Sequence, residues 1–118
     1  MKTKIEKEIT TWFRAINVED IPNDNGICIK VRGQQIAVFN FNKRNEYYAV
    51  ENLCPHKRQM ILSRGIIGDM QGEPKVACPF HKKTFSLKSG KNLNGEDYCI
   101  KTYPIKIEEG SMFIGFTD

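Results

Sequence analysis

Apolar and polar residues alternate over several short stretches of this chain. The longest such stretch is ICIKVRGQQIAVFNF, residues 27–41, in which a turn near Gly33 separates two alternating series. The first series sets Ile27, Ile29 and Val31 against Cys28, Lys30 and Arg32, and the second sets Ile36 and Val38 against Ala37, Phe39 and Phe41. Successive side chains of a β-strand face opposite ways, so this period of two predicts a hairpin.

The same alternation predicts further strands along the chain. EYYAVENL, residues 46–53, leads into Cys54, KVAC leads into Cys78, and TFSLKSG runs from His81 toward a Ser-Gly turn. A second hairpin is predicted at the C-terminus, with Ile105 and Ile107 before a turn at EEGS and Met112, Ile114 and Phe116 after it. Only NVEDIP, residues 17–22, indicates a helical turn, with Asn17 as its cap and Pro22 as its stop. The expected class is all-β, as a small sandwich or barrel.

Length and composition indicate one globular unit. The 118 residues suit a single domain, which we place at residues 11–118 after a charged N-terminal arm, residues 1–10. No apolar run approaches the roughly 18 to 20 residues that a membrane span requires. The start, MKTKIEKEIT, also lacks the apolar centre of a signal peptide. We therefore expect a cytoplasmic protein with no membrane segment.

The net charge of +4 does not indicate a nucleic-acid partner. The basic residues are interleaved with 14 acidic ones, and no aromatic stacking motif accompanies them. One basic group is notable, because its members directly follow the only two histidines of the chain: Lys57, Arg58, Lys82 and Lys83. Each alone is most simply a solvated surface charge. Together they predict an electropositive rim on which an acidic partner docks.

Each histidine lies close to a Cys-Pro step. CPH places Cys54 two positions before His56, and CPFH places Cys78 three positions before His81. Cytosolic cysteines serve more often as metal ligands or buried thiols than as disulfides, so these pairs predict a metal site. Cys28 and Cys99, in contrast, lie within strand-like alternation, where a thiol acts as a small apolar side chain.

The order of the candidate ligands favours an iron–sulfur cluster over zinc. A Cys2His2 zinc site usually takes two like ligands from each loop, whereas here each loop supplies one thiol and one imidazole. Two thiolates can then bind one metal and two imidazoles another, as in a Rieske [2Fe–2S] centre. Because imidazoles are neutral donors, the iron that they bind accepts an electron more readily. The pattern predicts an asymmetric one-electron centre.

With these motifs the chain resembles Rieske-domain proteins, and more narrowly the small subunits of assimilatory NAD(P)H nitrite reductases. The wider resemblance rests on CPH and CPFH; the narrower rests on CPHK, LSRG, GD, VACPFHKKTFSLKSG, IAVF and TYPIKIEEG, between about residues 11 and 117. It implies three stacked antiparallel sheets, with the cluster in a small subdomain at about residues 52–90. It also implies that Cys54 and Cys78 bind the inner iron and that His56 and His81 bind the outer one.

Several residues depart from the Rieske proteins of respiratory complexes. Gln59 and Phe80 replace two further cysteines, so the resemblance implies a site without their disulfide. Lys83 and Phe85 replace a Ser and a Tyr that donate hydrogen bonds toward cluster sulfurs in that group. Fewer donors stabilise the reduced cluster less, which predicts a reduction potential in the lower half of the Rieske range. The segment GKNLNGED also lacks the proline that many relatives have in a third covering loop.

The resemblance implies one-electron transfer as the small accessory subunit of an NAD(P)H-dependent nitrite reductase. The large subunit would bind flavin, a [4Fe–4S] cluster and sirohaem. The alternative is a free-standing Rieske ferredoxin that supplies an oxygenase or another acceptor. LSRG and GD favour the first, although Gly65 and Gly68 in this segment would also suit tight turns. No histidine remains for a mononuclear iron and no GxGxxG loop is present, so we expect no independent active site.

Overall fold

Strands make up most of the structure. The computed structural model describes residues 11–41, 46–55, 59–79, 83–97 and 99–116, so the predicted N-terminal arm lies outside the described residues. Within these ranges the helical segments are two short 3-10 helices, η1, Val18–Asp20, and η3, Leu62–Arg64. The first is the helical turn predicted at NVEDIP, although the Asn17 side chain makes no capping hydrogen bond to it. No helix in the described ranges is long and apolar enough to cross a membrane.

The central sheet contains the first predicted hairpin. Its strands, in spatial order, are β10 (Thr102–Tyr103), β4 (Glu46–Glu51), β3 (Gln34–Phe41) and β2 (Asn25–Val31). All neighbours are antiparallel, and the hairpin register pairs Ile29 with Ile36. Arg32 and Gly33 have φ values of 55° and 77°. Both positions of a two-residue hairpin turn need positive φ, so the turn predicted near Gly33 is confirmed.

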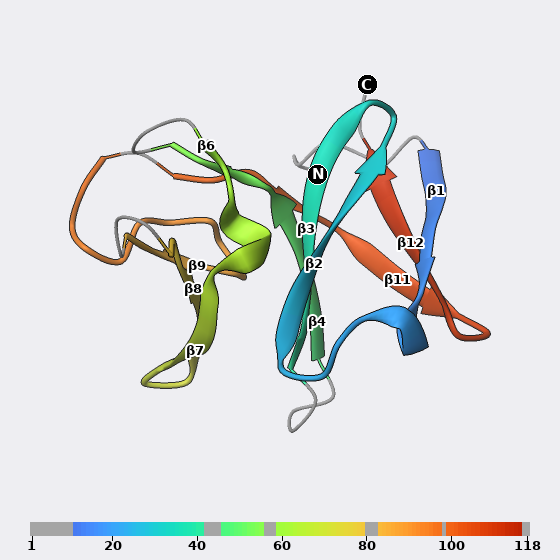
Figure 1. Cartoon of the computed structure of the whole chain (residues 1–118), viewed down its shortest axis with the longest axis horizontal. Coiled ribbons are helices and arrows are strands. Elements are labelled where there is room, and N and C mark those ends of the chain that lie inside the picture. The colour runs from blue at the N-terminus through green and yellow to red at the C-terminus, as the bar shows by residue number, and fades with distance from the viewer. Residues whose placement is uncertain (1–10, 42–45, 56–58, 80–82, 98, 117–118) are drawn as a thin grey trace, which may run out of the picture.

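A second sheet packs on one side of the central sheet (Figure 1). It contains β1, Thr11–Asn17, β12, Ser111–Phe116, and β11, Ile105–Glu108, in this spatial order. The predicted C-terminal hairpin is confirmed, with Glu109 and Gly110 at positive φ in its turn. Strand β1 was not predicted. Its alternation is obscured because six of its seven residues are half-buried and a register shift falls between Arg14 and Ile16.

A third sheet lies on the other side (Figure 1). It contains β7 (Ile66–Met70), β8 (Glu73–Ala77) and β9 (Thr84–Ser86). A separate two-stranded ribbon consists of β5 (Leu53–Cys54) and β6 (Gln59–Met60). The expected all-β class with three stacked antiparallel sheets is confirmed. The ribbon is an addition to that expectation.

Strand β3 separates two hydrophobic cores. Ile36 and Val38 face the sheet of β1, β11 and β12, where they pack with Met112 and other apolar residues. Ala37 and Phe39 face the third sheet and share a core with Cys54, Cys78 and others. Ile36 to Phe39 are all fully buried, so both faces of this strand are covered. The structure is therefore a three-layer arrangement, not a single sandwich or closed barrel.

The glycines of the LSRG and GD segment do not form tight turns, which was the alternative explanation of these residues. Gly65 has φ −72° at the end of η3, and Gly68 lies inside β7 opposite Lys75. The turn of the β7–β8 hairpin falls instead at Gln71 and Gly72, which both have positive φ. Gly65 is required for a different reason. A Cβ atom there would lie 2.4 Å from the carbonyl oxygen of Ala77, and backbone cannot easily move aside.

We expect Gly65→Ala to destabilise the fold by about 1 to 3 kcal/mol, the usual cost of overpacking a tight contact. Gly68→Ala is the matched control, because its Cβ would meet only the flexible Lys75 Cε, at 3.3 Å. Urea unfolding of the two variants gives the comparison. Equal midpoints would show that the close approach of β7 to β8 does not require a glycine.

Candidate metal centre

The first candidate ligand, Cys54, ends strand β5 and is fully buried. Across the ribbon it pairs with Gln59, so residues 55–58 form the connection between the two strands. The predicted ligand His56 and the basic Lys57 and Arg58 belong to this connection and lie outside the described residues. The structure thus places the thiol of the CPH motif inside the molecule, at the base of its loop.

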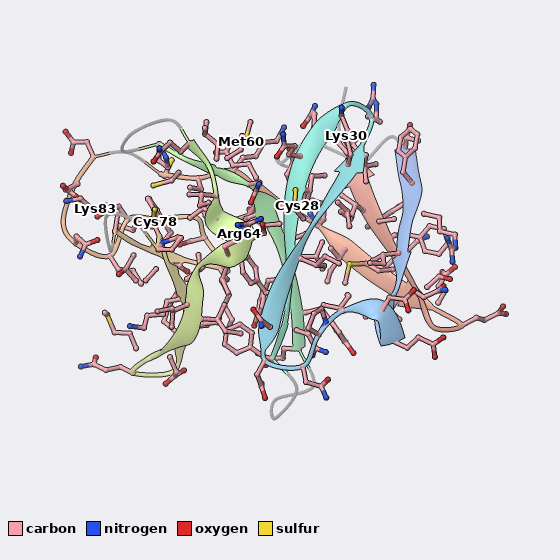
Figure 2. The ribbon with its side chains drawn as sticks, viewed as in Figure 1. Cys28, Lys30, Met60, Arg64, Cys78 and Lys83 are labelled. Carbon is pink, nitrogen blue, oxygen red and sulfur yellow. The ribbon has the colours of Figure 1, made fainter. Side chains whose placement is uncertain are left out.

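The second candidate ligand, Cys78, directly follows β8 and is 1% exposed. Its backbone N–H donates to the carbonyl oxygen of Lys83 over 2.8 Å, which closes the CPFHKK loop at its base. Figure 2 shows Cys78 and Lys83 near the same end of the molecule. Phe80, the predicted ligand His81 and Lys82 lie outside the described residues.

The two buried cysteines suit a soft metal. Both belong to the hydrophobic cluster that also contains Leu62, Val76 and Phe85. Among the described residues, which include all four cysteines, none forms a disulfide. A thiolate is costly in apolar surroundings unless a positive ion compensates it, and iron is such an ion. The two sulfur donors therefore fit one iron of a [2Fe–2S] cluster.

The described residues alone do not contain a group of three or more His, Cys, Asp or Glu placed to bind a metal ion. Both histidines of the chain are outside these residues, so the four-residue site stays a prediction. Cys28 and Cys99, which were predicted to be core or strand-face thiols, are exposed, so neither is a core residue. Cys28 lies on β2, and Cys99 makes an isolated bridge with Lys91.

The third covering loop is fixed by hydrogen bonds, although it has no proline. Leu93 N–H donates to the carbonyl oxygen of Thr84 over 2.8 Å, and Thr84 N–H donates to Asn94 Oδ1 over 2.7 Å. Asn92 is buried, and its Oδ1 accepts from the N–H groups of Asn94 and Glu96. These contacts tie the loop to β9, which directly follows the second ligand loop.

The two residues that replace the hydrogen-bonding Ser and Tyr have other roles in this structure. Lys83 Nζ lies 2.8 Å from Glu96 Oε2, in an ion pair whose side chains are 24% and 34% exposed. It therefore links the second ligand loop to the third loop, and Glu96 partly compensates its charge. Phe85 is fully buried in the core beside the cysteines and has no hydroxyl group to donate.

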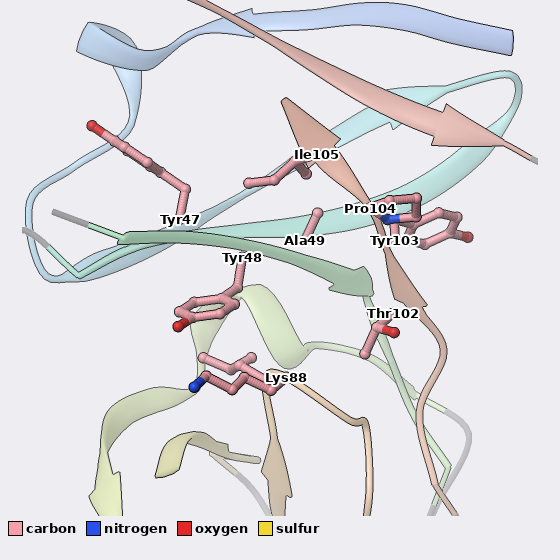
Figure 3. A pocket seen from close by; sticks show the side chains of 9 residues that line it. Tyr47, Tyr48, Ala49, Lys88, Thr102, Tyr103, Pro104 and Ile105 are labelled. Carbon is pink, nitrogen blue, oxygen red and sulfur yellow. The ribbon is translucent and has the colours of Figure 1, made fainter. Parts of the chain in front are cut away.

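Two open grooves involve the third sheet or the segment that follows it. One, of about 520 Å³, runs along β7 and β8 from the largely exposed Ile66 to Cys78 and Pro79. The other, of about 410 Å³, lies between β4, β10 and the Leu87–Lys88 segment (Figure 3). There Tyr48 faces Lys88, and burial together with the nearby Glu51 carboxylate raises the pKa of Tyr103. Of these two grooves, the one along β7 and β8 is lined by a candidate ligand.

Comparison with known proteins identifies the family. Residues 11–115 match the Rieske-like [2Fe-2S] domain family, which is most of the chain. The protein therefore belongs to the Rieske-like [2Fe–2S] domain family. This agrees with the all-β fold and with two buried cysteines in two adjacent loops.

Within this family the chain is related to nitrite reductase small subunits. It is 30% identical over 102 residues to the nitrite reductase (NADH) small subunit of Salmonella typhimurium, covering 86% of this chain and 94% of that protein. The solution structure of the nitrite reductase [NAD(P)H] small subunit from Erwinia carotovora is 33% identical, with a TM-score of 0.78, and the match covers 91% of this chain and 82% of that one.

Two other relatives differ in context. The nitrite reductase [NAD(P)H] large subunit of Klebsiella oxytoca is 34% identical over 104 residues, which are 88% of this chain but only 11% of that protein. A ferredoxin component of naphthalene 1,2-dioxygenase/salicylate 5-hydroxylase systems from Ralstonia is 36% identical over 98 residues, covering 82% of this chain and 88% of the ferredoxin. The domain thus occurs in proteins of different sizes.

We expect two fast-reacting and two slow-reacting thiols in the native protein. Cys28 and Cys99 are exposed, whereas Cys54 and Cys78 are buried. A thiol-specific chromogenic reagent measures the two phases, and Cys28→Ser should remove half of the fast phase. Reaction of all four thiols in the fast phase of the folded protein would contradict the burial of the candidate ligands.

Proposed function

We propose that this chain passes single electrons through a Rieske [2Fe–2S] cluster as the small accessory subunit of an NAD(P)H-dependent nitrite reductase. The observation that carries the proposal is the burial of Cys54 and Cys78 in one core, each at the start of a loop whose sequence continues with proline and then histidine. The relationship to nitrite reductase small subunits over most of their length supports the reaction assigned here.

In this proposal Cys54 and Cys78 bind one iron and His56 and His81 bind the other. When bound, such a cluster supplies a reversible one-electron couple. The chain contributes the rest. Its core shields the two sulfur donors from water, and the third loop is held to Lys83 and Thr84, which follow the second ligand loop. The chain itself has no active site and is the electron-transfer part of a larger oxidoreductase.

The proposed partner is a large reductase subunit with flavin, a [4Fe–4S] cluster and sirohaem, and the complex is placed in the cytoplasm. Lys57, Arg58 and Lys82 remain the proposed docking cations. Lys83 is the weakest of the four candidates, because it already pairs with Glu96 within the chain. An acidic patch on the partner would complement the remaining three charges.

A second candidate function is that of a free-standing ferredoxin. The identity to the Ralstonia ferredoxin component over 88% of its length favours it. A stable complex with a sirohaem-containing subunit on co-purification supports the first function, and rapid electron donation to an oxygenase without such a complex supports the second.

We expect the reduction potential to lie in the lower half of the Rieske range of about −150 to +300 mV. The reason is that Phe85 has no hydroxyl group and Lys83 is bound to Glu96, so neither replaces the hydrogen bonds of the respiratory proteins. A redox titration followed by visible absorbance measures the potential. A value near the upper end of the range would show that other donors compensate.

We expect Lys82→Glu to slow association with the large subunit at low salt and to flatten the dependence of the association rate on ionic strength. Lys30→Glu is the matched control, since it makes the same charge change at an exposed position on β2, away from Cys78 and Lys83 (Figure 2). Stopped-flow mixing gives both rates. Identical slowing in the two variants would rule out docking through the ligand loops.

A further inference from the structure

Asn52, two residues before Cys54, makes hydrogen bonds with both its side chain and its backbone. It is only 3% exposed. Its backbone N–H donates to the carbonyl oxygen of Gln35 over 3.1 Å, and its carbonyl oxygen accepts from the N–H groups of Ile61 and Leu62 over 2.9 and 3.0 Å. Its Oδ1 accepts from Ser63 N–H, and its Nδ2 donates to Gln35 Oε1 over 3.2 Å.

These five hydrogen bonds join three separate segments of the chain. Gln35 belongs to β3 of the central sheet, and Leu62 and Ser63 belong to η3, which follows the first ligand loop. Residues 53–60, with Cys54 and the CPH motif, lie between the two ends that Asn52 holds together. Asn52 therefore closes the base of the loop and hydrogen-bonds it to β3 of the central sheet.

Asparagine suits this position because it needs both an acceptor and a donor. Ser63 is buried, and no side chain caps η3 from its own N-cap residue, Ile61. Without Asn52 Oδ1 the Ser63 N–H would lose its acceptor where water cannot replace it. A carboxylate at residue 52 would keep this acceptor but would turn an oxygen toward Gln35 Oε1 in place of the amide donor.

We propose that Asn52 is a positioning residue for the cluster: its side chain fixes the first ligand loop to β3 and η3 and so holds Cys54 in place. The proposal rests on the proposed function in one respect, since it takes Cys54 as a ligand. The backbone groups of residue 52 that make the other three bonds are the same in Asn, Leu and Asp. Only the Oδ1 bond to Ser63 and the Nδ2 bond to Gln35 depend on the side chain.

Asn40 provides a matched control. Asn40 lies in β3 and, like Asn52, is buried, with 4% of it exposed. Its Nδ2 donates to the carbonyl oxygen of Ile21 and to Asn23 Oδ1. It pairs with Asn25 and Tyr47, whereas Gln35 lies near the opposite end of β3. Asn40→Leu therefore removes two amide hydrogen bonds of a buried asparagine without touching the ligand loop, although, unlike Asn52 Oδ1, Asn40 Oδ1 accepts no hydrogen bond among the described residues.

The test compares Asn52→Leu, Asn52→Asp and Asn40→Leu in the cluster-containing protein. Asn52→Leu should accelerate hydrogen exchange of the Ser63 amide on the order of tenfold or more, because its buried donor loses its acceptor. It should also raise the reduction potential, since water admitted to a loosened loop stabilises the more negative reduced cluster. Asn52→Asp should keep slow Ser63 exchange, because its carboxylate still accepts that bond. Asn40→Leu should change neither property.

The outcomes separate the two claims. If the wild-type protein shows no [2Fe–2S] spectrum, the proposed function is overturned. The hydrogen exchange of the Ser63 amide still tests whether the Asn52 side chain holds the base of the loop. The positioning role is overturned if Asn52→Leu folds and its Ser63 amide exchange rate and reduction potential both equal those of the wild-type protein. If Asn52→Leu does not fold, Gln35→Met decides. At this exposed residue it removes the Oε1 that accepts from Asn52 Nδ2 and, more weakly, from Cys28 Sγ over 3.7 Å, and it leaves the Asn52 side chain in place. A raised potential in that variant supports the role, and an unchanged one overturns it.

Discussion

The burial of both faces of β3 is the constraint on which the rest of the structure depends. One strand contributes Ile36 and Val38 to the core against β12 and Ala37 and Phe39 to the core that contains the cysteines. Burial of apolar surface is the main driving force of folding, so the two outer sheets pack against opposite faces of the same strand, β3. Strand β3 also contains Gln35, to which Asn52, at the base of the first ligand loop, is hydrogen-bonded. The scaffold and the site thus share one strand.

Much of this fold could be predicted from the alternation of apolar residues. Ile36 and Val38 against Ala37 and Phe39 indicated two apolar faces, and the structure assigns each face to its own core. The pattern could not show β1, whose half-buried residues and register shift hide the period of two. Nor could it show why Gly65 is a glycine, because the close carbonyl of Ala77 comes from a neighbouring strand twelve residues away.

The candidate site could also be predicted only in part from the sequence. The CPH and CPFH motifs are local, so the sequence alone identified the two cysteines that the structure places in one core. The pairing of Lys83 with Glu96 and the five bonds of Asn52 were not predictable from local pattern. Their partners lie 9 to 17 residues away in the chain, and only the folded structure brings them together. An asparagine two positions before a candidate ligand has no distinctive signal by itself.

The central claim is that two thiolates and two imidazoles bind the two irons of one cluster. The most direct test is pulsed electron paramagnetic resonance of the dithionite-reduced protein, which detects nitrogen nuclei coupled to the unpaired electron. Two strongly coupled imidazole nitrogens, one of them lost with each of His56→Cys and His81→Cys, are the predicted result. A reduced cluster without nitrogen coupling, or a colourless protein that contains one zinc ion per chain, would contradict the account.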